Sequence, residues 1–379
     1  MARDITKRLT DLHSRRSGSD RLNRLGLDEQ AQVLAKSLET EQWQSRASGK
    51  PYTQYALGSM RAVEPNYTRI SRETADRVAN QLLQSLAAQG LSVEFRLQGS
   101  VPLDVHIRGV SDVDLLALDA NFLTYYREGQ RARSGGYTSP STRTSVDVLK
   151  DLRAKSESAL KLKFPTATVD TTGAKAICIS GGSLARPVDV VPSHWLDTIE
   201  YQSSGMAHDR AVTILDNKVP TTVDSLPFLH IKRVGDRDDQ LRGGIRASIR
   251  LCKNVKADAE NEGKRIALPS FDIAATMYHA DPSALSMGHI YELGILAETQ
   301  RHLDALWRNQ EYAKTLRTPD GSRSIFDSAD KFTALLMLSS EIDDLAREVA
   351  REQDVSLQFT DSPALDVSRS VLAKTYIAA

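Results

Sequence analysis

A Gly-Ser dipeptide at the end of a predicted strand has the residue types that bind phosphate. Apolar and polar residues alternate over residues 92–98, which is the periodicity of a β-strand with one buried face. Gly99 then lets the backbone approach a phosphate group closely and adopt dihedral angles that other residues avoid. Ser100 adds a hydroxyl group and a backbone N–H as hydrogen-bond donors. The pair predicts a phosphate-binding turn.

Three aspartates in apolar segments have the chemistry of divalent-cation ligands. Asp112 and Asp114 open the next predicted strand, with eleven residues between Ser100 and Asp112. Because side chains alternate between the two faces of a strand, both carboxylates point the same way, about 7 Å apart along the chain. Asp189 lies in a later apolar strand and would supply a third carboxylate. Acids among apolar residues are costly to bury unless a cation pairs with them, and Mg²⁺ prefers oxygen ligands.

Each part of this pattern is weak by itself. A single Asp-x-Asp is more often a polar strand end or a turn. A second Gly-Ser dipeptide, Gly58-Ser59, is not followed by Asp-x-Asp at a workable distance, and we interpret it as a loop. The ordered combination of strand, Gly-Ser, Asp-x-Asp and a distant aspartate favours a site that binds phosphates and metal ions together.

A second set of candidates lies further along the chain. Basic residues at helical spacing share one face of a predicted helix, at Arg246, Arg250, Lys253 and Lys256. Cations on that face could hold a triphosphate, although a solvated basic face is the usual meaning of such a run. Ser270 and Phe271 open another predicted helix, whose N-terminus is a natural anion site. Phe271 would either stack on a base or belong to the core.

Length and composition allow two lobes. The 379 residues are 40% hydrophobic and 26% charged, which is ordinary for a globular protein. The net charge of zero argues against an extended nucleic-acid surface. No apolar run reaches the roughly 18 residues of a membrane span, and the charged N-terminus lacks the apolar core of a signal peptide. Cys178 and Cys252 are isolated, so we expect neither disulfides nor a zinc site, and a cytoplasmic location.

Local signals divide the chain into elements. Residues 1 to about 50 are predicted to be helical and polar, and residues 51–70 are predicted to be a loop because they contain two prolines. Ser71 is predicted to cap a helix that stops at Gly90. The segment 127–145 is rich in Gly, Ser, Thr and Arg and is predicted to be a mobile surface loop, which we place over the acceptor side of the site.

Strand signals are common before Pro227 and nearly absent after it. We therefore predict an α/β fold of the α+β kind, with a mixed-sheet catalytic lobe followed by a helical lobe. The catalytic lobe, with its N-terminal helices, would span residues 1–227, and the helical lobe residues 228–379. The active site is expected in the cleft between them.

Taken together, these motifs resemble those of the bacterial cGAS/DncV-like nucleotidyltransferases, the CD-NTases, which are similar to human cyclic GMP-AMP synthase and oligoadenylate synthase. Between about residues 92 and 280 the resemblance is carried by Gly99-Ser100, Asp112-x-Asp114, Pro187–Pro192, Ile249–Lys256 and Leu268–Phe271. It implies a polymerase-β-like catalytic lobe. It also implies that Lys253 and Ser270 contact the triphosphate and that Phe271 is placed to stack on a base. There is no zinc-binding insertion, so sensing of double-stranded DNA is not expected.

The resemblance further implies a cyclic oligonucleotide synthase of CBASS anti-phage defence. Its substrates would be NTPs, with ATP, GTP or both, and its products pyrophosphate and a cyclic di- or trinucleotide second messenger. Two Mg²⁺ ions, replaceable by Mn²⁺, would be held by Asp112, Asp114 and Asp189, with Asp189 nearest the attacking hydroxyl. Activator or conjugating proteins of the defence operon are expected partners, and a membrane is not.

Other functions use the same site. The alternatives are template-independent nucleotidyl transfer to RNA or tRNA, transfer to a protein or drug, and a scaffold that kept the fold without catalysis. Neutral charge and the lack of a recognisable RNA-binding module disfavour the first, and the presence of all three aspartates disfavours the last. Base choice, linkage and ring size depend on pocket residues that the sequence pattern does not identify.

Overall fold

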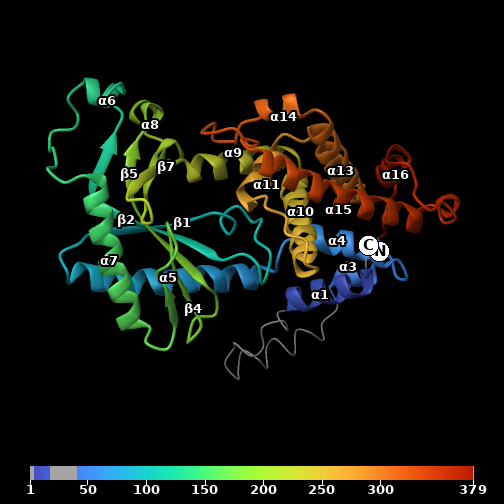
Figure 1. The fold of residues 1–379 in the computed structure, drawn as a ribbon, viewed down its shortest axis with the longest axis horizontal. Coiled ribbons are helices and arrows are strands. Elements are labelled where there is room, and N and C mark those ends of the chain that lie inside the picture. Colours follow the sequence, from blue (N-terminus) through green and yellow to red (C-terminus); the bar gives the residue numbers. More distant parts are fainter. Residues whose placement is uncertain (1–3, 18–40, 379) are drawn as a thin grey trace. The chain divides into compact units, whose positions relative to one another are not determined.

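The computed structural model describes residues 4–17 and 41–378, which form two units (Figure 1). Of the described residues, 64–103 and 111–233 form the sheet unit, and 4–17, 41–63, 104–110 and 234–378 form the helical unit. A mixed sheet in one unit and helices in the other confirm the predicted fold class. The division differs from the predicted one, because residues 4–17 and 41–63 group with the helical unit and the later boundary falls inside α9 (Pro227–Gln240).

In the described residues the sheet has seven strands. The central pair, β2 and β5, is parallel, and β1 lies antiparallel to the outer edge of β2. On the other side β5 is antiparallel to β4 with its first half and to β6 with its second half, while β3 extends from β4 and β7 from β6. The strands are β1 (Val93–Gln98), β2 (Val113–Tyr125), β3 (Thr168–Asp170), β4 (Ile177–Ser180), β5 (Val188–Asp197), β6 (Ala211–Asp216) and β7 (Thr221–Ser225).

The two faces of the sheet have different surroundings. Helices α5 (Pro65–Ala87) and α7 (Ser145–Lys163) pack on one face, where Val113, Leu115 and Val190 belong to the main core (Figure 1). Intervening side chains point to the opposite face, where a smaller apolar cluster contains Leu116, Leu118, Val191 and Trp195. Asp114 and Asp189 alternate with the core residues and therefore lie on this second face.

The segment 127–145, predicted to be a mobile loop, is attached to the sheet. It contains α6 (Gln130–Arg133), and α8 (Ile199–Ser204) contacts it. The hydroxyl of Tyr137 donates a hydrogen bond to Oδ2 of Asp197 at 2.7 Å, and its ring stacks on Tyr125 at 3.9 Å between centroids. Burial and the hydrogen bond to Asp197 raise the pKa of the Tyr137 hydroxyl, which therefore stays protonated as the donor.

The predicted loop at residues 51–70 is wrong. It contains α4 (Pro51–Met60) and the start of α5, and each proline stands at the first helical position, where its missing N–H costs nothing. Ser71 does not cap a helix; it lies inside α5, and its hydroxyl donates to a carbonyl one turn earlier. Gly58 is helical, and a Cβ there would come within 2.8 Å of the Trp43 ring, so close packing explains this glycine.

A buried polar network explains why the N-terminal helices belong to the helical unit. Arg15 on α1 (Ile5–Ser17) and Tyr55 on α4 both donate hydrogen bonds to the carboxylate of Asp258 on α10 (Gly244–Asn261). All three side chains are buried, and such a network is stable only when every member is paired. Of the predicted polar helices at residues 1–50, residues 18–40 lie outside the described part of the chain.

The remaining helices complete the helical unit. They are α3 (Gln42–Ser45), α11 (Ser270–Tyr278), α12 (Pro282–Ser286), α13 (Leu293–Arg308), α14 (Gln310–Thr315), α15 (Ala329–Gln353) and α16 (Leu365–Leu372). Within residues 4–17 and 41–378, no helix combines the length and the apolar character that crossing a membrane requires.

Candidate active site

The register of the sheet places polar side chains in one row across five strands. Gln98 pairs with Asp114, Asp114 with Asp189, Asp189 with Cys178, and Cys178 with Asp170. Because adjacent strands are about 4.8 Å apart, Asp114 and Asp189 are direct neighbours on the second face of the sheet. The structure thus brings together two of the three aspartates identified from the sequence. We call the five paired residues, Gln98, Asp114, Asp189, Cys178 and Asp170, the acidic row.

The third aspartate and the glycine turn adjoin the acidic row. Asp112 immediately precedes β2, is exposed, and lies two residues from Asp114. Gly99 follows β1 with φ +75°, and a Cβ at this position would lie only 2.2 Å from Oδ2 of Asp114. The Asp114 carboxylate can therefore lie against the turn only because residue 99 has no side chain. Ser100 is half-buried in the same turn.

Cys178 gives Asp189 a hydrogen-bond donor within the sheet. Burial and the nearby Asp189 carboxylate together raise the pKa of the Cys178 thiol to about 12, so the thiol remains protonated and donates to Asp189. Burial also raises the pKa of Asp189, and the bond from Cys178 opposes that shift. No sequence pattern connects Cys178 with Asp189, because they lie on separate strands and only the register pairs them.

The carboxylates of the acidic row and Asp112 meet part of what a divalent cation requires. Across the described ranges, 4–17 and 41–378, no group of three or more His, Cys, Asp or Glu side chains is arranged closely enough to hold a metal ion. The acids are therefore neighbours on one face and not a complete protein cage. Mg²⁺ commonly takes one or two carboxylates and completes its shell with water and substrate phosphates. Adjoining carboxylates beside a glycine turn fit an ion of that kind.

Two of the four basic residues on α10, Arg250 and Lys253, are buried, whereas Arg246 and Lys256 are half-buried. Nζ of Lys253 donates to the carbonyl of Val105 at 2.8 Å. Arg250 donates from Nε to the carbonyl of Met60 at 2.8 Å and from Nη1 to that of Asp104 at 2.7 Å. Burial lowers the pKa of Arg250 to about 10, so it keeps its charge at neutral pH. These cations thus hold the end of α4 and the segment that follows the Gly99-Ser100 turn in the chain.

The other predicted residues of the helical unit begin α11. Ser270 is its first residue and is exposed, while Phe271 is half-buried with the guanidinium of Arg323 at 5.3 Å from its ring centroid. Arg323 also pairs with the buried carboxylate of Asp272. Lys253, Ser270 and Phe271 belong to the helical unit, whereas the glycine turn and the three aspartates belong to the sheet unit.

A mixed sheet with carboxylates on adjacent central strands and a glycine turn against one of them defines a nucleotidyltransferase fold. The chain is 47% identical over 313 residues to the cyclic dinucleotide synthase CdnE of Yersinia aleksiciae, an alignment that covers 83% of this chain and 80% of that protein. It is 30% identical over 311 residues to a c-di-GMP synthase of Lachnospiraceae bacterium strain RUG226, covering 76% and 86% of the two chains.

Structural comparison agrees with the sequence relatives. The STING-associated CdnE c-di-GMP synthase from Capnocytophaga granulosa matches with a TM-score of 0.68 and 25% identity, covering 90% of this chain and 97% of that one. No family model matches the chain. The chain belongs to the CdnE cyclic dinucleotide synthases, within the cGAS/DncV-like nucleotidyltransferases. It is thus a nucleotidyltransferase that makes cyclic oligonucleotides from NTPs, as predicted, in a family that uses divalent metals.

Proposed function

We propose that this enzyme joins two nucleoside triphosphates, including GTP, into a cyclic dinucleotide through two successive transfers. In each transfer the oxygen of a ribose hydroxyl bonds to an α-phosphorus, its proton leaves, and the bond to pyrophosphate breaks. The observation that carries the proposal is the register of Asp114 and Asp189, with Gly99 against Asp114. The names of the Lachnospiraceae and Capnocytophaga relatives, both c-di-GMP synthases, support the choice of GTP, and ATP stays open as the second substrate.

The residues of the sheet unit have distinct proposed roles. Asp112 and Asp114 would hold the donor side of a pair of Mg²⁺ ions, and Asp189 would complete the acceptor side. When bound, such ions neutralise the charge of the leaving group and lower the pKa of the attacking hydroxyl. Asp189 is proposed as the carboxylate nearest that hydroxyl, acting either as the acceptor of its proton or as a ligand of the ion that activates it. The N–H groups of Gly99 and Ser100 would bind β- and γ-phosphates.

The helical-unit residues and the biological setting complete the proposal. Lys253 and Ser270 are proposed to contact the triphosphate, and Phe271 to stack on a base. Lys253 also has a structural role, because it holds the Val105 carbonyl. We place the reaction in the cytoplasm, with proteins of a defence operon as activators or conjugating partners.

The test is the fate of four labelled NTPs incubated with Mg²⁺ and no polymer, followed by phosphatase. Wild type should give a phosphatase-resistant product, and Asp114→Asn and Asp189→Asn should give at least about 100-fold less. The matched control is Asp76→Asn, the same substitution at an exposed position on α5 of the same unit, and it should keep wild-type activity. EDTA should abolish the product, and Mn²⁺ should restore it.

Two outcomes would contradict the proposal. Wild-type rates in Asp114→Asn or Asp189→Asn would remove these residues from the reaction. If no cyclic product forms but label moves to added RNA or protein, the acceptor is a macromolecule instead.

A further inference from the structure

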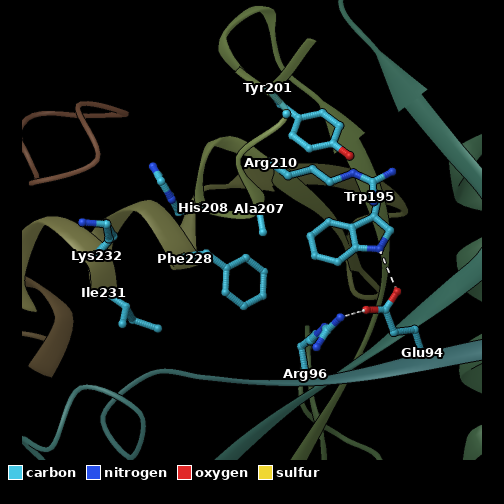
Figure 2. A pocket seen from close by; sticks show the side chains of 11 residues that line it. Glu94, Arg96, Trp195, Tyr201, Ala207, His208, Arg210, Phe228, Ile231 and Lys232 are labelled. Carbon is cyan, nitrogen blue, oxygen red and sulfur yellow. Dashed lines mark hydrogen bonds and ion pairs between the residues drawn. The ribbon is translucent and has the colours of Figure 1, made fainter. Parts of the chain in front are cut away.

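A pocket of about 680 Å³ opens on the sheet unit, on the same face as the acidic row (Figure 2). Glu94 and Arg96 enter it from β1 and have the same parity as Gln98, so all three point to one face. Trp195 enters from β5 and belongs to the apolar cluster of that face. The pocket is not part of the site described above, and the roles proposed for the acidic row do not use it.

Strand geometry sets its distance from the acidic row. Arg96 and Glu94 lie two and four residues before Gln98 on β1, which corresponds to about 7 and 13 Å along the strand. The Gly99-Ser100 turn lies beyond the row in the opposite direction along the chain. A nucleotide in the pocket would therefore present its ribose, and not its triphosphate, to the aspartates.

The lining suits a flat aromatic group attached to an anion. Trp195 and Phe228 form an apolar wall, with ring centroids 5.6 Å apart. The guanidinium of Arg210 lies 4.5 Å from the centroid of Trp195 and 4.9 Å from that of Tyr201, and its Nε donates to the buried carboxylate of Asp197 at 2.6 Å, which fixes it between the two rings. His208 and Lys232 add basic groups around the opening (Figure 2). Base stacking on such walls, with cations near the sugar and phosphate, is the usual way that proteins bind nucleotides without reading a duplex.

Two paired side chains could distinguish bases. Nη2 of Arg96 lies 2.5 Å from Oε1 of Glu94, and Nε1 of Trp195 donates to Oε2 of Glu94 at 3.3 Å (Figure 2). A carboxylate has about four acceptor positions, so Glu94 can still receive two more donors. Guanine presents two adjacent donors, N1–H and the N2 amino group, beside the acceptor O6. Adenine presents one donor beside an acceptor, which a carboxylate matches only once.

We propose that this pocket binds the guanine base of the acceptor nucleotide. Glu94 accepts from N1–H and the N2 amino group, Arg96 donates to O6, and Trp195 and Phe228 pack against the ring. The inference rests on the proposed function, because it assigns the pocket to the acceptor, which is the nucleotide whose hydroxyl attacks. It adds a determinant of base choice that the catalytic aspartates do not provide.

The first experiment is Glu94→Gln, which replaces two acceptors by one acceptor and one donor and so matches adenine. With GTP and ATP in competition, the ratio of guanine to adenine in the product should fall by about tenfold to 100-fold, the discrimination expected of a good bidentate pair. The matched control is Glu73→Gln on α5, where Glu73 pairs with Arg69 at the same 2.5 Å but is exposed. The control should leave the base ratio unchanged. An unchanged ratio in Glu94→Gln would overturn the proposal.

The second experiment measures binding without turnover. GMP and AMP are titrated into the full-length protein without metal, and tryptophan fluorescence is recorded. GMP should bind more tightly than AMP in wild type and in Asp114→Asn, and Glu94→Gln should remove the preference. If GMP shows this Glu94-dependent binding but wild type forms no cyclic product, the proposed function fails and the base site stands. If cyclic product forms but GMP binds equally to wild type and Glu94→Gln, the base site fails and the function stands.

Discussion

Replacing Gly99 by alanine tests whether the position of Asp114 controls the reaction. The glycine has φ +75°, and an added Cβ would stand 2.2 Å from Oδ2 and 3.1 Å from Cγ of Asp114. Aspartate is short and its β-carbon is part of β2, so it cannot swing far away. The substitution should therefore displace the carboxylate and leave the rest of the sheet in place.

The magnitude follows from two separate costs. An alanine in the left-handed region costs about 1–2 kcal/mol of folding free energy. Ordinary contact requires a separation of roughly 3.4 Å, so the carboxylate must move by about 1 Å. A displacement of about 1 Å at a reacting centre can lower a rate on the order of 100-fold. Stability and rate should both fall, and only the rate loss depends on Asp114.

The assay measures pyrophosphate release at saturating NTP together with the urea midpoint of unfolding. Gly90→Ala is the matched control, because Gly90 has φ +76° in the same unit but nothing within 4 Å of an added Cβ. Both variants should lose similar stability, and only Gly99→Ala should lose about 100-fold in rate. If Gly99→Ala kept the rate of Gly90→Ala, the carboxylate against the turn would have no part in catalysis.

Three further predictions concern stability and local order. Burial lowers the pKa of His302 to about 4, whereas the imidazole of the unfolded chain has its ordinary pKa of about 6.5. Between these values the unfolded chain binds a proton that the folded chain does not, so the free energy of unfolding decreases as the pH is lowered from about 6.5 to about 4. Relative to His302→Gln, wild type should lose about 2 kcal/mol between pH 7 and pH 5 in urea titrations, and a constant difference would contradict this. Asp258→Ala leaves a buried arginine unpaired and should cost about 3–5 kcal/mol, whereas Glu311→Ala in an exposed pair should cost under about 1 kcal/mol; equal losses would refute the network. Tyr137→Phe removes the bond to Asp197, so trypsin should cut the segment 127–145 faster than in wild type, and unchanged kinetics would argue against this anchor.

The elements around the acidic row could be predicted because their signals are local. Alternation gave the strand before Gly99, and spacing put Asp112 and Asp114 on one face. The pairing of Asp114 with Asp189 could not be derived, because it depends on which strand lies beside β2. The same holds for Cys178, whose link to Asp189 exists only through the pairing of β4 with β5.

One wrong prediction, and contacts that could not be predicted, have physical causes as well. Prolines end helices but also begin them, and composition alone does not distinguish the two positions at residues 51–70. Arg250 and Lys253 form a basic run in sequence, yet their partners are main-chain carbonyls, which leave no mark in the sequence. The N-terminal helices were assigned to the catalytic lobe because the acid that binds them, Asp258, lies about two hundred residues away.

Strand β1 connects the candidate functions of the sheet unit. Its end leads into the glycine turn, Gln98 adjoins the acidic row, and Arg96 and Glu94 line the pocket, all at positions fixed by one rigid strand. Groups on a strand keep their spacing better than groups on loops. Asp114 is on the neighbouring strand, opposite Gln98 and four positions from the level of Glu94. Under these proposals, a substitution at Glu94 alters which base is bound without moving Asp114, the carboxylate proposed to act in catalysis. This separation allows base choice and rate to be measured independently in the same sheet.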